Sequence, residues 1–384
     1  MFDVTDLLSA GRNAVGVELG NSFYNEIGGG WNWPSATWRD EPKLLFNLDI
    51  HYTDGTVDTV ASDTSWKLTK NGPTISNGVY YGDSYDARKE LTGFNTAGYD
   101  DSAWPAASVV EGTGGRLSCQ LSDPVRRTST FTVKSITRVG TDSYVVATPE
   151  MTTGWIKLMS INASAGDRIA ITYGEKLNSD GTVQKLGGSD GVCSNWWPHA
   201  YNQQDIYISA GKENESFEPK FSYKGFQYVQ IDGYPGELTA DDLEIYRVSN
   251  DVAIASEIET SNTMVNQLHK LMRTTLLNNF QGKPTDTPVW EKNGWLGDAN
   301  AGLLTMLYNF DMSNYLPNFI EIMEDCFNLY GTVPDMVPTA GWGLNGNAAV
   351  WNTIYVIGTA ELWNTYGMEN YTEVQYDSMR QFAL

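Results

Sequence analysis

The chain has 384 residues, enough for two or three domains. Its 47 acidic residues outnumber 25 basic ones and give a formal net charge of −22, which disfavours nucleic acid and anionic membrane surfaces as partners. Three cysteines and three histidines lie far apart, which argues against a disulfide framework, a metal centre or a histidine-based triad, so no cofactor or metal is expected. No signal peptide or transmembrane run is seen, which favours a cytoplasmic location, although the opening residues are typical of a domain interior.

The first part of the chain is predicted to be β structure. Residues 13–20 alternate as a short strand, and residues 44–52 alternate apolar and polar side chains more strictly. Asp54-Gly55 then predicts a hairpin turn, with the chain returning over residues 56–61, because glycine tolerates the positive φ that the turn needs. A further strand is expected to begin at residues 63–67.

A boundary is predicted near residues 118–124, followed by a second antiparallel sandwich. The segment at residues 184–202 is polar and rich in glycine and serine, typical of a surface loop that could line a site. Short strands with intervening turns are expected at residues 143–148, 155–161, 168–173, 205–209 and 226–231.

From residue 251 the apolar spacing becomes helical. Apolar side chains between residues 264 and 280 fall on one helix face, and Thr260 or Ser261 is available as the N-cap. Further amphipathic helices are expected at residues 298–310, 313–329 and 348–366.

The stretch Pro284-Thr-Asp-Thr-Pro-Val-Trp-Glu-Lys-Asn-Gly-Trp-Leu-Gly-Asp298 interleaves three acids with two indoles on a loop between two predicted helices. Indole faces cover the apolar faces of a pyranose ring, and carboxylates accept hydrogen bonds from its hydroxyls. An acid kept protonated by apolar surroundings can donate to a glycosidic oxygen. The pattern therefore favours sugar chemistry.

Each of these residues also has a structural interpretation. Glu291 is either a general acid or a solvated loop residue, with Trp290 and Lys292 acting on its pKa in opposite directions. Asp286 either starts an Asx-turn or accepts sugar hydroxyls. Asp298 suits a first helical turn as well as a ligand, and Trp295 suits a core. A second loop, residues 333–347, again carries an acid and an indole, Asp335 and Trp342, which favours a shared mouth.

The stretch at residues 284–299 resembles the signature Pro-Thr-Asp-Cys-Pro-Gln-Arg-(Asp)-Glu-Arg-Leu-Gly-Trp-Thr-Gly-Asp-Ala of the bacterial α-L-rhamnosidases, the inverting glycoside hydrolases of family 78. Upstream, Tyr81-Gly-Asp-Ser-Tyr-Asp-Ala-Arg88 and Gly174-Glu-Lys-Leu-Asn-Ser-Asp-Gly181 are similar to two of the family's β-sandwiches. The resemblance implies a carbohydrate-binding-like sandwich over residues 1–117, a concanavalin-like sandwich over 118–250 and the N-terminal part of an (α/α)6 barrel over 251–384.

The resemblance also implies the chemistry. Glu291 would be the general acid of an enzyme that removes terminal α-L-rhamnose from a rhamnosylated small molecule or oligosaccharide, with inversion. The substrate-binding residues would be Asp286, Trp290, Trp295, Asp298 and Trp342. A homo-oligomer stays open.

Two departures qualify this expectation. Trp290 stands where the family has an arginine, and Thr287 where it has a cysteine, so the substrate is in doubt. The family's barrel has six helical hairpins and a late glutamate as general base, so the chain looks like a fragment that is inactive alone; neither Asp335 nor Glu361 is supported as a base. The alternatives are a non-catalytic carbohydrate-binding protein and a polysaccharide lyase on a related scaffold.

Overall fold

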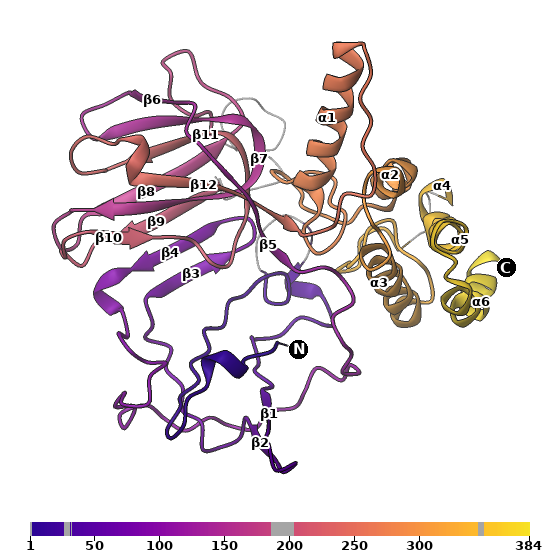
Figure 1. Cartoon of the computed structure of the whole chain (residues 1–384), viewed down its shortest axis with the longest axis horizontal. Helices are drawn as coiled ribbons and strands as arrows, with labels where there is room; N and C mark the ends of the chain where they lie inside the picture. The colour runs from indigo at the N-terminus through magenta and orange to yellow at the C-terminus, as the bar shows by residue number, and fades with distance from the viewer. Residues whose placement is uncertain (1, 27–30, 32, 186–202, 345–348) are drawn as a thin grey trace.

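The structure is a computed structural model and describes residues 2–26, 31, 33–185, 203–344 and 349–384. Figure 1 shows the strands on one side, the helices α1–α6 on the other, and the N-terminal stretch below the strands. Sheet-rich modules followed by helices are the fold class predicted from the sequence. Nearly all of the predicted loop at residues 184–202 lies outside the described residues.

A two-stranded hairpin is the first sheet, formed by β1 (Asn47–His51) and β2 (Val57–Ala61), which pair antiparallel. The Tyr52 N–H donates to the Thr56 carbonyl across the turn, at 2.9 Å. Gly55 takes a φ of +88°, which glycine adopts without strain. The hairpin predicted at Asp54-Gly55 is therefore confirmed.

Two other predicted strands of this part are wrong. Residues 13–20 form no strand, because the main chain there lies on aromatic rings instead of beside another strand. A Cβ on Gly16 would lie 2.5 Å from the Phe94 ring, and one on Gly20 would lie 2.1 Å from the Phe221 ring. The stretch at residues 63–67 contributes only an isolated bridge.

The larger sheet runs in the order β3-β4-β9-β8-β11-β7-β12-β5, and β6 and β10 also pair with β7. β4 pairs parallel with β9, so strands from either side of the predicted boundary share one sheet. The domain limits predicted from the sequence stay a prediction. The strands are β3 (Thr74–Gly78), β4 (Gly82–Asp86), β5 (Val125–Phe131), β6 (Ser135–Arg138), β7 (Ser143–Ile161), β8 (Arg168–Gly174), β9 (Gln204–Ile208), β10 (Glu215–Phe217), β11 (Lys224–Asp232) and β12 (Leu243–Asn250).

One long strand, β7, replaces the two strands predicted at residues 143–148 and 155–161. Its first half pairs with β6 and β11, and its second half pairs with β12 and β10. Gly154 allows the close approach to β12 in the middle, because a Cβ there would lie 2.1 Å from the Tyr246 carbonyl oxygen. β7 thereby connects the two ends of the sheet.

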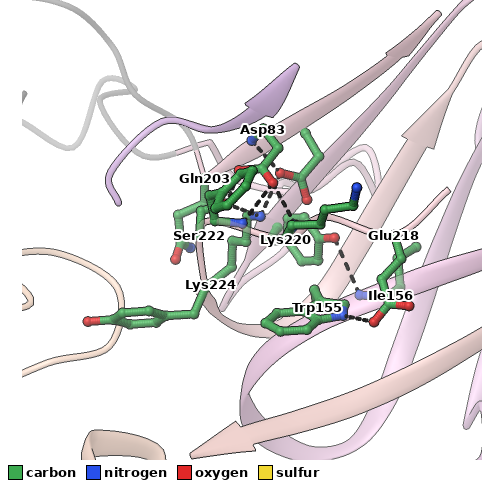
Figure 2. A network of polar contacts seen from close by, with 12 residues as sticks. Asp83, Trp155, Ile156, Gln203, Glu218, Lys220, Ser222 and Lys224 are labelled. Atoms are coloured by element: carbon green, nitrogen blue, oxygen red, sulfur yellow. Dashed lines mark hydrogen bonds and ion pairs between the residues drawn. The ribbon is translucent and has the colours of Figure 1, made fainter. Parts of the chain in front are cut away.

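A buried polar network joins β4, β9 and the start of β11 (Figure 2). The Lys224 ammonium donates to the Asp205 carboxylate at 2.5 Å and to the Ser222 hydroxyl at 2.7 Å. The Asp83 carboxylate accepts from the Ser222 hydroxyl and from the main-chain N–H of Lys220, and the Asp83 N–H donates to Asp205. The network fixes the segment just before β11, which contacts the helices' loops.

The helical part has its own apolar core, made by α2, α3, α5, α6 and residues of the connecting loops. Among the described residues, no helix is both long and apolar enough to cross a membrane. The helices are α1 (Thr263–Asn279), α2 (Leu296–Asn309), α3 (Tyr315–Tyr330), α4 (Ala349–Asn352), α5 (Ile354–Tyr366) and α6 (Glu369–Ala383).

The helix positions agree with the sequence except in detail. The N-cap of α1 is Asn262, whose side chain accepts from the N–H of Met264, so neither Thr260 nor Ser261 is the cap. The helix predicted at residues 348–366 is split into α4 and α5, because side chains of Thr353 and Asn300 take the Val350 carbonyl. α6 has no counterpart among the predictions. α1 projects from the molecule and leaves much of its apolar face exposed (Figure 1).

Candidate active site

Two of the three acids predicted to act on sugar, Asp286 and Glu291, lie on the loop between α1 and α2, residues 281–295, called here the acid loop, and Asp298 follows in the first turn of α2. The loop is pinched by Asp286 and Asn293, each of which donates its main-chain N–H to the other, at 2.9 Å. In one direction the acceptor is the Asp286 carboxylate, and in the other the Asn293 carbonyl. An Asx-turn onto the residue two positions on is impossible, because Pro288 has no N–H.

Glu291 follows the turn of the acid loop and is half-buried. Its carboxyl Oε2 accepts a hydrogen bond from the Trp295 indole Nε1 at 2.6 Å, and its carbonyl accepts from the Tyr80 hydroxyl at 2.8 Å. Both side chain and main chain are therefore fixed. A freely solvated loop glutamate is excluded by this geometry.

Lys292 does not neutralise Glu291. Its ammonium is buried and donates to two main-chain carbonyls, of Val79 at 2.9 Å and of Tyr223 at 2.6 Å. Burial holds the pKa of Lys292 well below its usual range. The sequence left open whether Trp290 or Lys292 dominates the surroundings of Glu291. In the structure the ammonium of Lys292 points away from the Glu291 carboxyl group.

Three carboxylates share one electrostatic neighbourhood. Burial, together with the smaller effect of the negative charges of Glu291 and Asp298, raises the pKa of Asp286 to about 7. Asp298 lies in the first turn of α2 behind the N-cap residue Trp295, and its side chain is exposed. The first-turn interpretation of Asp298 is thus correct, and it leaves the carboxylate open to a ligand.

A second buried cation, Lys283, belongs to the same loop. Its ammonium lies 3.8 Å from the centroid of the Phe23 ring. Burial lowers the pKa of Lys283 to about 7, and the charge of Asp286 opposes that shift. The loop therefore carries two titratable groups whose pKa values approach neutrality from opposite sides.

Indole rings meet edge to face beside the acids. The Trp31 ring lies 5.8 Å from the Trp295 ring and 5.4 Å from the Trp342 ring, and Trp351 lies 5.9 Å from Trp295. The structure thus brings the predicted residues Trp295 and Trp342 together through a third indole. Trp290 is half-buried in the turn, and no ring contact among the described residues joins it to this cluster.

The second predicted loop packs directly on the first. The Asp335 carbonyl accepts from the N–H of Leu296 at 2.9 Å, and the Val337 N–H donates to the Gly294 carbonyl at 2.9 Å. The Asp335 Oδ1 and Trp342 Nε1 atoms are buried without a hydrogen-bond partner in the structure. The two loops thus form one surface, and its second half holds polar atoms that a ligand can satisfy.

Three contributors, Trp31, Tyr80 and Trp351, were not predicted from the sequence, and Lys292 was named there only as a neighbour that acts on the pKa of Glu291. Trp31 stands in a glycine-rich stretch with further tryptophans, which is a compositional signal for a binding loop. Tyr80 and Lys292 carry no such signal, because their contacts join residues more than 200 positions apart. Across the described residues, no group of three or more His, Cys, Asp or Glu is placed to hold a metal ion.

Three family models match successive parts of the chain. They describe an alpha-L-rhamnosidase N-terminal domain at residues 1–129, a bacterial alpha-L-rhamnosidase concanavalin-like domain at 137–249 and a bacterial alpha-L-rhamnosidase 6 hairpin glycosidase domain at 253–383. The chain belongs to the bacterial α-L-rhamnosidase family. The acid loop of this rhamnosidase-family chain lies in the part matched by the hairpin domain.

Individual rhamnosidases agree with this assignment. An alpha-L-rhamnosidase of Formosa agariphila is 33% identical over 351 residues, 88% of this chain and 34% of that protein. The solved alpha-L-rhamnosidase of Dictyoglumus thermophilum superposes with a TM-score of 0.84 at 31% identity, over 95% of this chain and 39% of that one. The enzyme of Streptomyces avermitilis, solved with L-rhamnose, gives 0.75 at 26% identity over 90% and 34%. The chain spans about a third of the curated relative's length.

Proposed function

We propose that this chain forms part of an α-L-rhamnosidase that removes terminal α-L-rhamnose from rhamnosides. The observation that carries the proposal is the acid cluster beside Trp295, where the charges of Glu291 on the acid loop and Asp298 at the start of α2 raise the pKa of Asp286, in a chain of this family. The substrate follows from the family and from the rhamnose bound to the Streptomyces avermitilis relative. The substrate-binding roles of Asp286, Asp298 and the indoles belong to the proposal.

Glu291 acts as the general acid in this scheme. One carboxyl oxygen accepts from the Trp295 indole, which leaves the other free to carry the proton. The proton passes to the glycosidic oxygen as its bond to C1 breaks, and the aglycone leaves as a neutral alcohol. In an inverting enzyme a second carboxylate, about 6.5–9.5 Å from the acid, takes a proton from the water that attacks C1 from the opposite face. No described residue is assigned that role.

A competing assignment rests on one specific observation. A general acid works best when its pKa lies near the working pH, and Asp286 has a pKa raised to about 7 by burial. The roles would then be exchanged, with Asp286 donating the proton and Glu291 accepting from the indole and the sugar. The family signature favours Glu291, whereas this electrostatic argument favours Asp286.

Leaving-group acidity separates the two assignments in the whole protein. We expect Glu291→Gln to lose little activity on an activated aryl rhamnoside and roughly 10²–10⁴-fold on alkyl rhamnosides, because only poor leaving groups need the proton. L-Rhamnose binding should persist in Glu291→Gln. Asp286→Asn should weaken rhamnose binding and lose a similar factor on every substrate. The measurement is kcat/KM across a series of aglycones.

Four outcomes count against parts of this proposal. Leaving-group dependence in Asp286→Asn alone would transfer the acid role to Asp286. Wild-type rates in both variants would remove the site from the reaction. An unsaturated sugar product would identify a lyase, and an α-configured rhamnose product, seen by NMR immediately after release, would contradict inversion.

A further inference from the structure

Glu291 is held by parts of the molecule far from it in sequence. The Tyr80 hydroxyl donates to the Glu291 carbonyl at 2.8 Å and accepts from the Trp33 indole at 3.3 Å. Lys292, the residue after Glu291, donates to the carbonyl of Val79, the residue before Tyr80, at 2.9 Å. Two adjacent residues of the N-terminal region, Val79 and Tyr80, are therefore hydrogen-bonded to two adjacent residues of the acid loop.

A second set of contacts comes from the segment before β11 and from the start of that strand. The Tyr223 carbonyl accepts from the Lys292 ammonium at 2.6 Å. Gly225 lies so close to the acid loop that a Cβ on it would be 2.5 Å from the Val289 side chain and 3.0 Å from Pro288. The turn that presents Glu291 is thus packed on one region and hydrogen-bonded to two.

The local conformation of Lys292 shows that these contacts determine it. Its φ of +55° is unusual for a residue with a Cβ and persists where the surroundings over-determine the backbone. A buried ammonium is costly unless its hydrogens are bonded, and the Val79 and Tyr223 acceptors are main-chain carbonyls that cannot rotate away as side chains can. The Val79 peptide is itself fixed, because its N–H donates to the Glu26 carboxylate at 2.7 Å.

We propose that Lys292 is a positioning residue, which together with Tyr80 clamps the acid loop to the two strand-rich regions and so sets the orientation of Glu291. Its effect on catalysis rests on the proposed function, whereas its effect on the geometry of Glu291 does not. The geometry of the acid loop thereby depends on the strand-rich regions. A side chain that is displaced by about 1 Å loses on the order of 10²-fold in rate.

The first test reads the geometry of Glu291 without turnover. Because the Trp295 indole N–H donates to Glu291, its NMR resonance reports the position and protonation of that carboxyl group. In the isotopically labelled chain we expect this resonance to shift in Lys292→Met and in Tyr80→Phe. Tyr80→Phe keeps the test valid if Lys292→Met does not fold.

Tyr144→Phe is the matched control. Tyr144 and Tyr80 are 3% and 4% exposed, and each hydroxyl donates to a main-chain carbonyl, but the partner of Tyr144 is Gly236, outside the acid loop. Its loss should cost comparable stability and leave the Trp295 resonance in place. In the whole protein, Lys292→Met and Tyr80→Phe should lower kcat about 10- to 100-fold with KM little changed, and Tyr144→Phe should not.

An unchanged Trp295 resonance in folded Lys292→Met and Tyr80→Phe would overturn the proposal. So would an equal loss of kcat in Tyr144→Phe, because general softening of the fold would then explain it. If the wild-type whole protein releases no rhamnose from an aryl rhamnoside, the proposed function fails, and the indole resonance still decides whether Lys292 positions Glu291.

Discussion

Two titratable side chains lie three residues apart on the acid loop, the buried Lys283 and the half-buried Asp286. Burial raises the pKa of Asp286 from 3.8 to about 7 and lowers that of Lys283 from 10.5 to about 7. In both cases the charged form is the one that the surroundings disfavour. Near pH 7 both side chains can therefore gain or lose a proton at small cost, as the proposed function would require.

The pH dependence of stability should reveal Asp286. Because its folded pKa lies above its unfolded value, its contribution to stability is fully present below about pH 4 and is lost as the pH rises through about 7. We expect Asp286→Asn to abolish this loss. The difference between wild type and variant in unfolding free energy should change by no more than about 4 kcal/mol, measured by urea unfolding at several pH values. A pH-independent difference would contradict the raised pKa.

Residues close in sequence were the ones that sequence analysis could find. Asp286, Glu291 and Trp295 were predicted together because one loop carries them, and the structure joins Trp295 to Glu291 directly. Trp31 and Tyr80 were missed because their contacts with the acid loop depend on the tertiary fold. The sequence also could not say where the Lys292 ammonium points, since that depends on two carbonyls from other regions.

At the scale of elements, the first turn of α2 packs against the Trp351 indole. A Cβ on Gly297, in its first turn, would lie 2.5 Å from the Trp351 ring, whose other neighbour is the Trp295 indole. Glycine at this position therefore lets the helix start pack against the indole cluster. Gly302, further along the same helix, has only ordinary contacts at 3.7 Å and beyond.

This difference predicts opposite effects of the same substitution. Gly297→Ala should destabilise the protein by about 1–3 kcal/mol, because overpacking forces Trp351 to move. Gly302→Ala should stabilise it by about 0.5–1 kcal/mol, because alanine restricts the unfolded chain and fits the space. Thermal unfolding and indole fluorescence of both variants measure this. Equal shifts of the melting temperature in the two variants would show that the Trp351 contact does not constrain Gly297.

Regular elements were predictable where the pattern is local and strong. The hairpin at Asp54-Gly55 and the helix at residues 264–280 were found from turn chemistry and helical spacing. The strand at residues 13–20 was wrong because its alternation has no pairing partner in the fold. The break at Thr353 was missed because the Val350 carbonyl bonds to a side chain of another helix, Asn300.

At the scale of the whole molecule, the regions predicted as separate modules are joined at two places. β4 pairs with β9 inside one sheet, and the buried network of Figure 2 ties both strands to the segment that precedes β11. That segment includes Tyr223, whose carbonyl holds Lys292. The polar network thus supports the acid loop through this segment. No spacing in the sequence could indicate that role.

The contribution of this network to the free energy of unfolding can be measured through its buried ion pair. The side chains of Lys224 and Asp205 are 1% and 0% exposed. Lys224→Met leaves the Asp205 carboxylate buried without its cation and should cost about 3–5 kcal/mol. Adding Asp205→Asn removes the stranded charge, so the double variant should be more stable than Lys224→Met alone. Lys220→Met is the control, because its half-exposed pair with Glu18 should contribute only about 0–1 kcal/mol.

Urea unfolding followed by tryptophan fluorescence gives these free energies, and the Trp295 indole resonance shows whether the disturbance reaches the acid loop. Lys224 lies next to Tyr223, so Lys224→Met should shift that resonance while Lys220→Met leaves it unchanged. A cost for Lys224→Met no larger than for Lys220→Met would mean that the ion pair does not stabilise this region. A large cost with an unmoved resonance would instead separate the stability of the sheet from the geometry of Glu291, because the Tyr223 carbonyl would then hold Lys292 without support from the network.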